Sequence, residues 1–159
     1  MKESELYPIV AKYFVNMGYF VFVDCWALPP FVKPDIIALS PHRCVGEYLM
    51  YTSSSDLVSV EVKRRRKEIK KGLYQLLTYS SFSDYVFLAL TEDILPPMYG
   101  KYVSFLKDRG FGLLSITKDR HIIPILSASR LSPEPNVKLR VMRNLGLVGE
   151  MIVVHRCVV

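Results

Sequence analysis

Apolar positions follow a helical spacing at the start of the chain and then gather into short runs. The helical spacing covers Leu6, Ile9, Val10, Tyr13, Phe14 and Met17. It predicts a helix that begins between Ser4 and Tyr7 and stops at Gly18, because glycine suits the position after a helix. The runs that follow lie at residues 19–25, 35–39 and 57–63. They are rich in β-branched, aromatic and other apolar side chains, so each predicts a strand.

The second half of the chain alternates between helical and strand patterns. Helices are predicted at residues 67–82, 99–108 and 137–145, and strands at residues 85–90, 111–116 and 121–126. Residues 151–154 predict a last strand or a docking tail, and residues 47–52 an extension of a hairpin. The order of elements predicts an α/β fold with a mixed sheet flanked by helices, in one domain over residues 1–159.

Length and composition are those of a globular domain. The chain has 159 residues, of which 50% are hydrophobic and 23% charged, so a sizeable core is expected. It lacks an apolar run of the roughly 18 residues that a membrane span needs, and its start is unlike a signal peptide. We therefore expect a cytoplasmic protein without membrane contact. Cys25, Cys44 and Cys157 are too scattered for a zinc site or a disulfide framework, which predicts reduced thiols.

Positive charge is concentrated in one segment. The formal net charge is +6, and a dense group of cations comprises Lys63, Arg64, Arg65, Arg66, Lys67, Lys70 and Lys71. Cations at a helix start oppose the helix macrodipole, so helix stability does not explain the group. Contact with the phosphates of a nucleic acid would explain it, and binding would then depend on salt. A solvated helix start is the alternative.

Two acids and a lysine stand at the ends of predicted strands. Asp35 opens one apolar run, whereas Glu61 and Lys63 close another. Strand side chains alternate between faces, so Glu61 and Lys63 project together, away from the neighbouring valines. Carboxylates bind a divalent cation, and an ammonium can stabilise charge during phosphodiester hydrolysis. An exposed cross-strand ion pair between Glu61 and Lys63 is the alternative.

In these residues the chain resembles the PD-(D/E)xK nuclease superfamily, which includes many restriction endonucleases, archaeal Holliday junction resolvases and RecB-like nucleases. Pro34-Asp35 matches the first motif and Glu61-Val62-Lys63 the second. The resemblance implies a restriction-endonuclease-like αβββαβ core over about residues 3–92. Residues 93–159 would form a C-terminal αββ extension, in which we recognise no motif.

The resemblance also implies a DNA nuclease that uses Mg²⁺ or Mn²⁺. Asp35, Glu61 and the backbone carbonyl of Val62 would hold the metal. Family members often carry a glutamate on the first helix as a further ligand or water-orienting group. Glu5 is the candidate for that role, with Glu3 as the fallback.

Further roles are expected of the residues around the motif. Lys63 would act as a base or would stabilise charge near the scissile phosphate. Gln75 and Tyr79 match the QxxxY element of RecB-like members and would contact a phosphate or a base, although helix packing explains them nearly as well. Trp26 lies in a loop before Asp35, where it either stacks on a base or caps the core.

The expected partner is DNA, and the expected assembly is a homodimer, because cutting a duplex generally needs two sites. The apolar segment 151–159 could supply the dimer surface. Two other functions remain open. One is a catalytically inactive nucleic-acid-binding module of the same fold, and the other is a soluble interaction protein with an accidental motif.

Overall fold

A six-stranded sheet forms the centre of the computed structural model, which describes residues 1–45, 48–95, 100–146 and 152–156. In spatial order the strands are β1 Phe20–Val23, β2 Ile36–Leu39, β5 Leu57–Lys63, β6 Tyr85–Thr91, β7 Gly112–Ile116 and β8 Ile122–Leu126. β5, β6 and β7 run parallel, and the other neighbours pair antiparallel. The predicted mixed sheet is therefore confirmed.

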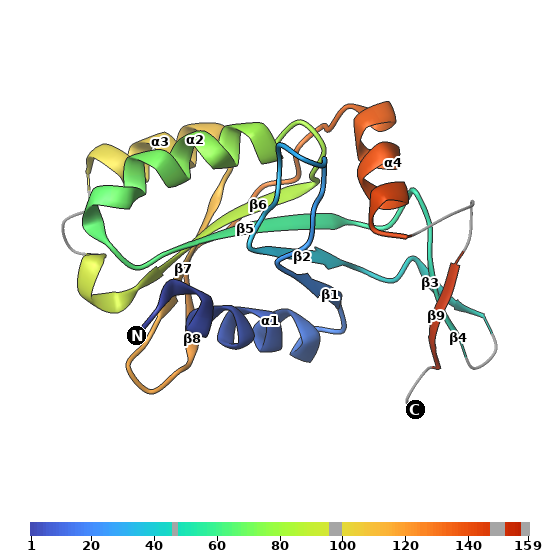
Figure 1. Ribbon diagram of the computed structural model, residues 1–159, viewed down its shortest axis with the longest axis horizontal. Coiled ribbons are helices and arrows are strands. Elements are labelled where there is room, and N and C mark those ends of the chain that lie inside the picture. Colours follow the sequence, from blue (N-terminus) through green and yellow to red (C-terminus); the bar gives the residue numbers. More distant parts are fainter. Residues whose placement is uncertain (46–47, 96–99, 147–151, 157–159) are drawn as a thin grey trace.

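Helices cover both faces of this sheet (Figure 1). α1 Tyr7–Asn16 lies against one face, whereas α2 Ile69–Tyr79 and α3 Lys101–Arg109 lie over the other. α4 Pro135–Asn144 stands on the α2 side, beyond the loop that joins β1 to β2. A second, three-stranded sheet of β3 Arg43–Val45, β4 Tyr48–Tyr51 and β9 Ile152–Arg156 projects at one end.

Side-chain alternation along β5 divides the core into two layers. Val58, Val60 and Val62 pack with apolar residues of α1, whereas Leu57 packs with residues of α2. All seven residues of β5 are buried, because helices cover both faces of this strand. The polar residues Glu61 and Lys63 alternate with the valines, so they lie on the α2 face.

Most predicted elements are present with shifted ends. The helix predicted at 67–82 is a 3-10 turn at Arg66–Glu68 followed by α2, and it ends at Tyr79. The stretch predicted at 47–52 to extend a hairpin contains β4, which pairs antiparallel with the earlier strand β3 at Arg43–Val45. Of the two alternatives predicted for residues 151–154, the described residues from Ile152 on form a strand, β9, which pairs antiparallel with β4. The expected dimer surface at 151–159 involves side chains outside the described residues.

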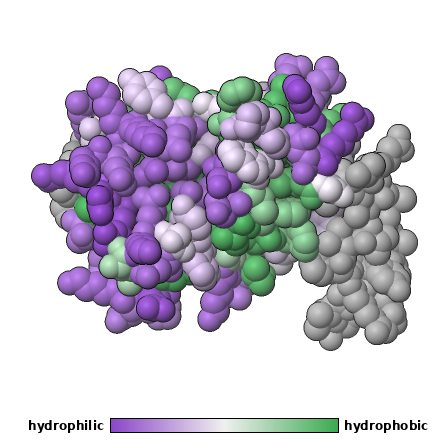
Figure 2. Space-filling view, viewed as in Figure 1, coloured by the Kyte–Doolittle hydropathy of each residue, from purple (hydrophilic) through white to green (hydrophobic). Residues whose placement is uncertain are grey.

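Polar and apolar side chains are unevenly distributed on the face shown in Figure 2. Apolar residues gather in the middle of the view, over β1 and the foot of the β1–β2 loop, and hydrophilic residues cover the half that carries the start of α2. Among the described helices, none combines the length and the apolar character that crossing a membrane requires.

Candidate active site

The pairing of β2 with β5 brings the two predicted acids together. Ile36 is the register partner of Val60, so the residue before Ile36 and the residue after Val60 face each other across the strand pair. These residues are Asp35 and Glu61, 8% and 2% exposed respectively. The sequence motif therefore corresponds to one buried place in the fold.

Asp35 is held by two donors that come from different parts of the chain. Its Oδ1 atom accepts a hydrogen bond of 2.6 Å from the Tyr7 hydroxyl, and its Oδ2 atom accepts one of 2.7 Å from the Val62 backbone N–H. Burial raises the pKa of Asp35, and these hydrogen bonds oppose the rise without cancelling it. The carboxylate is thus fixed in orientation, yet it carries a desolvation penalty.

Glu61 is positioned by side chains of α2 and β5. Its Oε2 atom accepts a hydrogen bond of 2.5 Å from the Tyr79 hydroxyl, and its Oε1 atom lies 2.9 Å from Lys63 Nζ. Burial raises the pKa of Glu61 to about 7, and the neighbouring charge of Asp35 adds to the rise. At neutral pH this carboxyl group is therefore close to its midpoint of ionisation.

Lys63 is a buried cation that faces several acids. Burial would lower its pKa, but the charges of Glu61, Glu3 and Asp35 outweigh burial and raise the pKa above the ordinary lysine value. Its Nζ atom lies 3.7 Å from Glu3 Oε1. In this environment Lys63 is an ammonium, which favours charge stabilisation over a role as a base.

A glycine on α2 makes room for the lysine stem. A Cβ atom added to Gly72 would lie 3.2 Å from Lys63 Cγ and 3.5 Å from Leu88 Cδ1. The approach to Leu88 is ordinary van der Waals contact, but the approach to Lys63 would require the lysine stem to give way. Gly72 therefore lets the helix approach β5 closely and leaves Lys63 pointing at Glu61.

The four charged groups around the site do not balance. Glu3, Asp35 and Glu61 supply three carboxyl groups. Among the described residues, Lys63 supplies the ammonium that pairs with Glu3 and Glu61, and the charge of Asp35 also acts on it. We call these four residues the carboxylate cluster. Within the described ranges, no group of three or more His, Cys, Asp or Glu side chains is arranged to hold a metal ion by itself. Burial nevertheless raises the pKa of both Asp35 and Glu61, so added positive charge is favourable between them.

The structure distinguishes between the two candidate glutamates of the first helix. Glu3 approaches Lys63, whereas Glu5 is exposed and its Oε2 atom accepts a hydrogen bond of 2.9 Å from the Lys2 backbone N–H. Both belong to the 3-10 turn Glu3–Leu6 that precedes α1, so their side chains diverge. Glu3 is the acid that the fold brings to the cluster, and Glu5 caps the turn.

The two residues predicted on α2 have different surroundings. Tyr79 is buried and its hydroxyl contacts Glu61, so it belongs to the site. Gln75 is half-buried, and its Oε1 atom is buried without a hydrogen-bond partner among the described residues. Tyr79 orients a carboxylate instead of reaching outward to a phosphate. Val62 contributes its N–H to Asp35, and the role of its carbonyl stays a prediction.

The basic segment leads away from the cluster toward the surface. Arg64 is half-buried, and the exposed cations are Arg65, Arg66, Lys67, Lys70 and Lys71. Arg64 borders two hollows. One, of about 300 Å³, is lined by Met1, Lys2, Glu3, Arg64, Arg65 and Glu68 and so adjoins the carboxylate cluster. The phosphate-binding role predicted for the segment thus has an open, basic space beside the acids.

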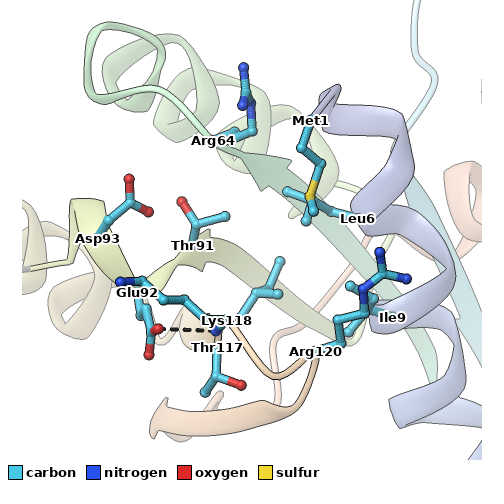
Figure 3. A pocket seen from close by; sticks show the side chains of 11 residues that line it. Met1, Leu6, Ile9, Arg64, Thr91, Glu92, Asp93, Thr117, Lys118 and Arg120 are labelled. Atoms are coloured by element: carbon cyan, nitrogen blue, oxygen red, sulfur yellow. Dashed lines mark hydrogen bonds between the residues drawn. The ribbon is translucent and has the colours of Figure 1, made fainter.

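The other hollow that Arg64 borders lies at the carboxyl ends of β6 and β7 (Figure 3). It measures about 190 Å³, with Leu6 and Ile9 on one side and Thr91 on the other. In Figure 3 the Arg64 side chain points away from this hollow, while Glu92 accepts a hydrogen bond of 3.0 Å from the Lys118 backbone N–H. Arg64 therefore faces the α2 side of the molecule, where the acids are.

Sequence reasoning missed two residues of the site, Tyr7 and Gly72. Tyr7 fits the apolar stripe of the first helix, and its hydrogen-bond partner Asp35 is far away in the sequence. Gly72 lies inside α2, where every other residue has a higher helix propensity than glycine. A glycine inside a helix lowers stability relative to alanine, so it was the one available signal of a close approach.

Comparison with known proteins shows likeness at the level of fold. No family model matches the chain, and no curated protein matches it. A solved structure of a protein of unknown function from Silicibacter pomeroyi is similar, with a TM-score of 0.66 and 13% sequence identity. The alignment covers 92% of this chain and 85% of that chain. At this identity the likeness shows a shared fold and leaves the chemistry to the residues of this chain.

Proposed function

We propose that the protein is a metal-dependent DNA nuclease of the PD-(D/E)xK type, with the αβββαβ core of that superfamily. The observation that carries the proposal is the carboxylate cluster, in which buried Asp35 and Glu61 face Lys63 at adjoining strand ends. A structural ion pair would balance its charges, whereas this group has an excess of acid. An excess of buried acid beside a basic surface suits a site that recruits a divalent cation and a phosphodiester.

The donor atoms of the cluster fit Mg²⁺ or Mn²⁺. Carboxylate oxygens of Asp35 and Glu61 would hold the ion, with Glu3 near enough to orient a water. A bound ion of this kind lowers the pKa of water and offsets the negative charge of a phosphate. Both acids carry a desolvation penalty, which a bound cation would relieve.

The residues around the acids have separable tasks. The Tyr7 hydroxyl donates a hydrogen bond to Asp35, and the Tyr79 hydroxyl donates one to Glu61. Each hydrogen bond fixes the direction in which its carboxylate points. Lys63, as an ammonium, would donate to a phosphate oxygen and stabilise the charge that develops on it. Arg64 and Arg65 border the adjoining hollow and would hold the phosphate backbone.

An inactive DNA-binding module of the same fold is the second candidate, favoured by the exposed cations after β5. Such a module would bind DNA through Arg65 and Arg66 without any use for buried acids. Because burial of Asp35 and Glu61 raises the pKa of each, keeping them has a cost in stability. That cost is explained by catalysis and not by binding alone.

A cleavage assay separates these functions. Supercoiled, linear, single-stranded and four-way-junction DNA are incubated with the protein in Mg²⁺, Mn²⁺ or EDTA. We expect cleavage with metal and none in EDTA, and its loss in Asp35→Asn. Asp108→Asn, which changes an exposed carboxylate on α3, is the matched control and should cleave normally. Salt-dependent binding without cleavage would support the inactive module, and neither activity would overturn both proposals.

A further inference from the structure

The loop between β1 and β2 is a compact, internally bonded structure. The backbone N–H groups of Ala27 and Leu28 donate to the Val32 carbonyl at 2.9 Å and 3.0 Å, and the Val32 N–H donates back to Leu28 at 2.9 Å. Ala27 is completely buried. α4 braces the loop, because Asn144 Nδ2 donates to the Ala27 carbonyl at 2.9 Å. The tip of the loop is thereby held in one shape.

This firmly held tip presents apolar rings to solvent. Phe31 is 87% exposed, the highest value among the large apolar residues of the described chain, and Trp26 is 42% exposed. Exposed rings on a rigid scaffold lose little conformational entropy when they bind a flat partner. A tip that only closed the core would turn these rings inward, so their exposure needs another explanation.

A hollow of about 450 Å³ lies between the tip and α4. It is lined by Leu28, Pro29, Phe31, Val32, Arg140 and Asn144. One wall is therefore apolar with an aromatic ring, and the opposite wall carries a guanidinium on an exposed arginine. A nucleotide has the matching two parts, a flat base and an anionic phosphate.

Positive charge continues around the hollow. Arg143 is exposed on the same helix, whereas Lys33 Nζ, 5.1 Å from the centre of the Trp26 ring, is paired with Asp24 Oδ1 at 3.0 Å. Lys138 does not contribute, because it is buried and its Nζ atom lies 2.8 Å from Asp84 Oδ2. The exposed cations of this region complement an anionic strand and disfavour an apolar protein partner.

The aromatic wall of the hollow is also close in sequence to Asp35 of the carboxylate cluster. Phe31 precedes Asp35 by four residues. Four residues of extended chain reach at most about 14 Å, so the ring lies within a few nucleotides' length of the carboxylate cluster. A strand that placed a phosphate at the cluster could place a neighbouring base at Phe31.

We propose that this hollow receives an unpaired base of a DNA strand, which stacks on Phe31 while Arg140 contacts an adjacent phosphate. The proposal rests on the proposed function only in taking DNA as the partner, and it adds a substrate class, DNA with single-stranded or unpaired segments. Bases in an intact duplex are stacked on each other and cannot enter such a hollow without being displaced.

The test measures binding in EDTA, so cleavage plays no part. Fluorescence anisotropy of labelled oligothymidylate and of a blunt duplex is measured for the wild type and for Phe31→Ala. Stacking on an aromatic ring predicts a loss of about tenfold for oligothymidylate and less than about twofold for the duplex. Arg140→Gln should lower the slope of log affinity against log salt by about one. Ile123→Ala removes an exposed apolar side chain on β8 and should change neither affinity.

Trp26, the sole tryptophan, gives an independent signal. Because it lies in the same loop, oligothymidylate should change its emission in the wild type, and the change should need higher DNA concentrations in Phe31→Ala. Equal affinity of Phe31→Ala and the wild type for oligothymidylate would overturn the inference, as would an equal loss for both DNA forms. The two proposals can fail separately. If the binding measurements overturn this inference but the wild type still cleaves DNA with metal, the nuclease proposal stands. If the protein binds oligothymidylate selectively but does not cleave, this inference stands and the nuclease proposal fails.

Discussion

Two groups of charged residues lie at opposite ends of β5, and they differ in how their charges are matched. The carboxylate cluster lies at the carboxyl end, near Lys63. At the other end, the amino acids around Leu57 include a second group, which we call the balanced cluster: Asp56, Asp84, Arg130 and Lys138. One group has more acids than cations, and the other has equal numbers.

The balanced cluster ties the C-terminal part of the chain to the sheet. Asp84 Oδ2 accepts a hydrogen bond of 2.8 Å from the Leu57 backbone N–H and lies 2.8 Å from Lys138 Nζ. Lys138 Nζ also donates to the Ser55 carbonyl at 2.8 Å. Arg130 makes two hydrogen bonds to Asp56, at 2.7 Å and 3.1 Å. Each acid thus meets a cation of its own, and α4 is anchored to the end of β5.

The two clusters differ in whether each buried carboxylate has a cation of its own. A fold that buries a carboxylate for structure supplies it with a partner, as Asp84 receives Lys138. The carboxylate cluster keeps two buried acids whose pKa values are raised, with a single ammonium among them. One end of β5 thus has matched charges and the other an excess of acid, which is the arrangement that the proposed metal site would require.

The largest effect is expected from breaking the balanced cluster. Lys138→Met keeps the length of the side chain but leaves Asp84 buried beside the more distant Arg130, whose Nη1 atom is 3.9 Å away. Removing one partner of a buried pair typically costs about 3–5 kcal/mol. Urea unfolding should show this loss, while cleavage per folded molecule stays unchanged at low temperature. Arg140→Gln, an exposed change on the same helix, should leave stability intact. A stable but inactive Lys138→Met protein would contradict the division of roles.

The next effect comes from neutralising one acid of the carboxylate cluster. In Asp35→Asn the amide oxygen can accept from the Val62 N–H, and the amide nitrogen can donate to the Tyr7 hydroxyl. Cleavage should fall at least about a hundredfold, because a metal ligand is lost. The melting temperature in EDTA should stay equal or rise. Burial penalises the charged form of Asp35 and so raises its pKa, and a neutral amide avoids the cost of burying a charge. Added Mn²⁺ should stabilise the wild type and not the variant. A large loss of stability in EDTA would assign Asp35 a structural role.

Lys63→Met should lower turnover by about ten- to a hundredfold while leaving Mn²⁺ affinity within a few-fold of the wild type. The methionine stem can occupy the space beside Gly72, so packing is kept. An ammonium donates and does not coordinate, which separates turnover from metal binding. Single-turnover rates at saturating metal, together with calorimetry, measure both. Loss of metal binding with normal turnover at saturation would refute the assigned role.

The strands were predictable from local pattern, but the contacts that distinguish the two clusters were not. The run around β5 alternates its two faces visibly, so the common direction of Glu61 and Lys63 followed from the sequence. The pairing of Asp35 with Tyr7 and of Asp84 with Lys138 joins residues that are distant in the chain. A single sequence carries no signal for such pairs, because they depend on how the helices pack onto the sheet. For the same reason the sequence does not separate Lys138, which pairs with Asp84, from the exposed Arg140 and Arg143 of the same helix.

A smaller effect concerns pH and the carboxylate cluster. Burial raises the pKa of Glu61 to about 7, so its contribution to stability is fully present below the unfolded value near 4.5 and is lost as pH rises through about 7. Metal competes with this proton, so Mn²⁺ affinity should increase with pH, at most about tenfold per unit below 7. Calorimetry between pH 5.5 and 8.5 tests the slope. Glu61→Gln should bind weakly with a flatter profile, and a flat wild-type profile would show that Glu61 is not a ligand.

The smallest effect is expected from the arginines that follow β5. Arg65 and Arg66 are exposed, whereas Arg64 is half-buried at the edge of the hollow beside Glu3. Replacing the three with alanine should weaken DNA binding similarly for all sequences, because phosphate contacts position DNA without reading bases. The slope of log affinity against log salt should fall by about one to two units, because side chains that point in different directions do not all reach phosphates.

The matched control for the triple change is Lys107→Ala together with Arg109→Ala, which removes two exposed cations from α3. These cations belong to α3, outside the basic segment that follows β5, and have no assigned phosphate contact, so the salt slope should stay at the wild-type value. Anisotropy titrations in EDTA between about 50 and 200 mM salt give the slopes, since that range spans large changes in affinity for a multi-phosphate contact. An unchanged slope in the arginine variant would show that the segment faces solvent. The exposed cations of α4, Arg140 and Arg143, would then be the main phosphate contacts, and their removal should lower the slope instead.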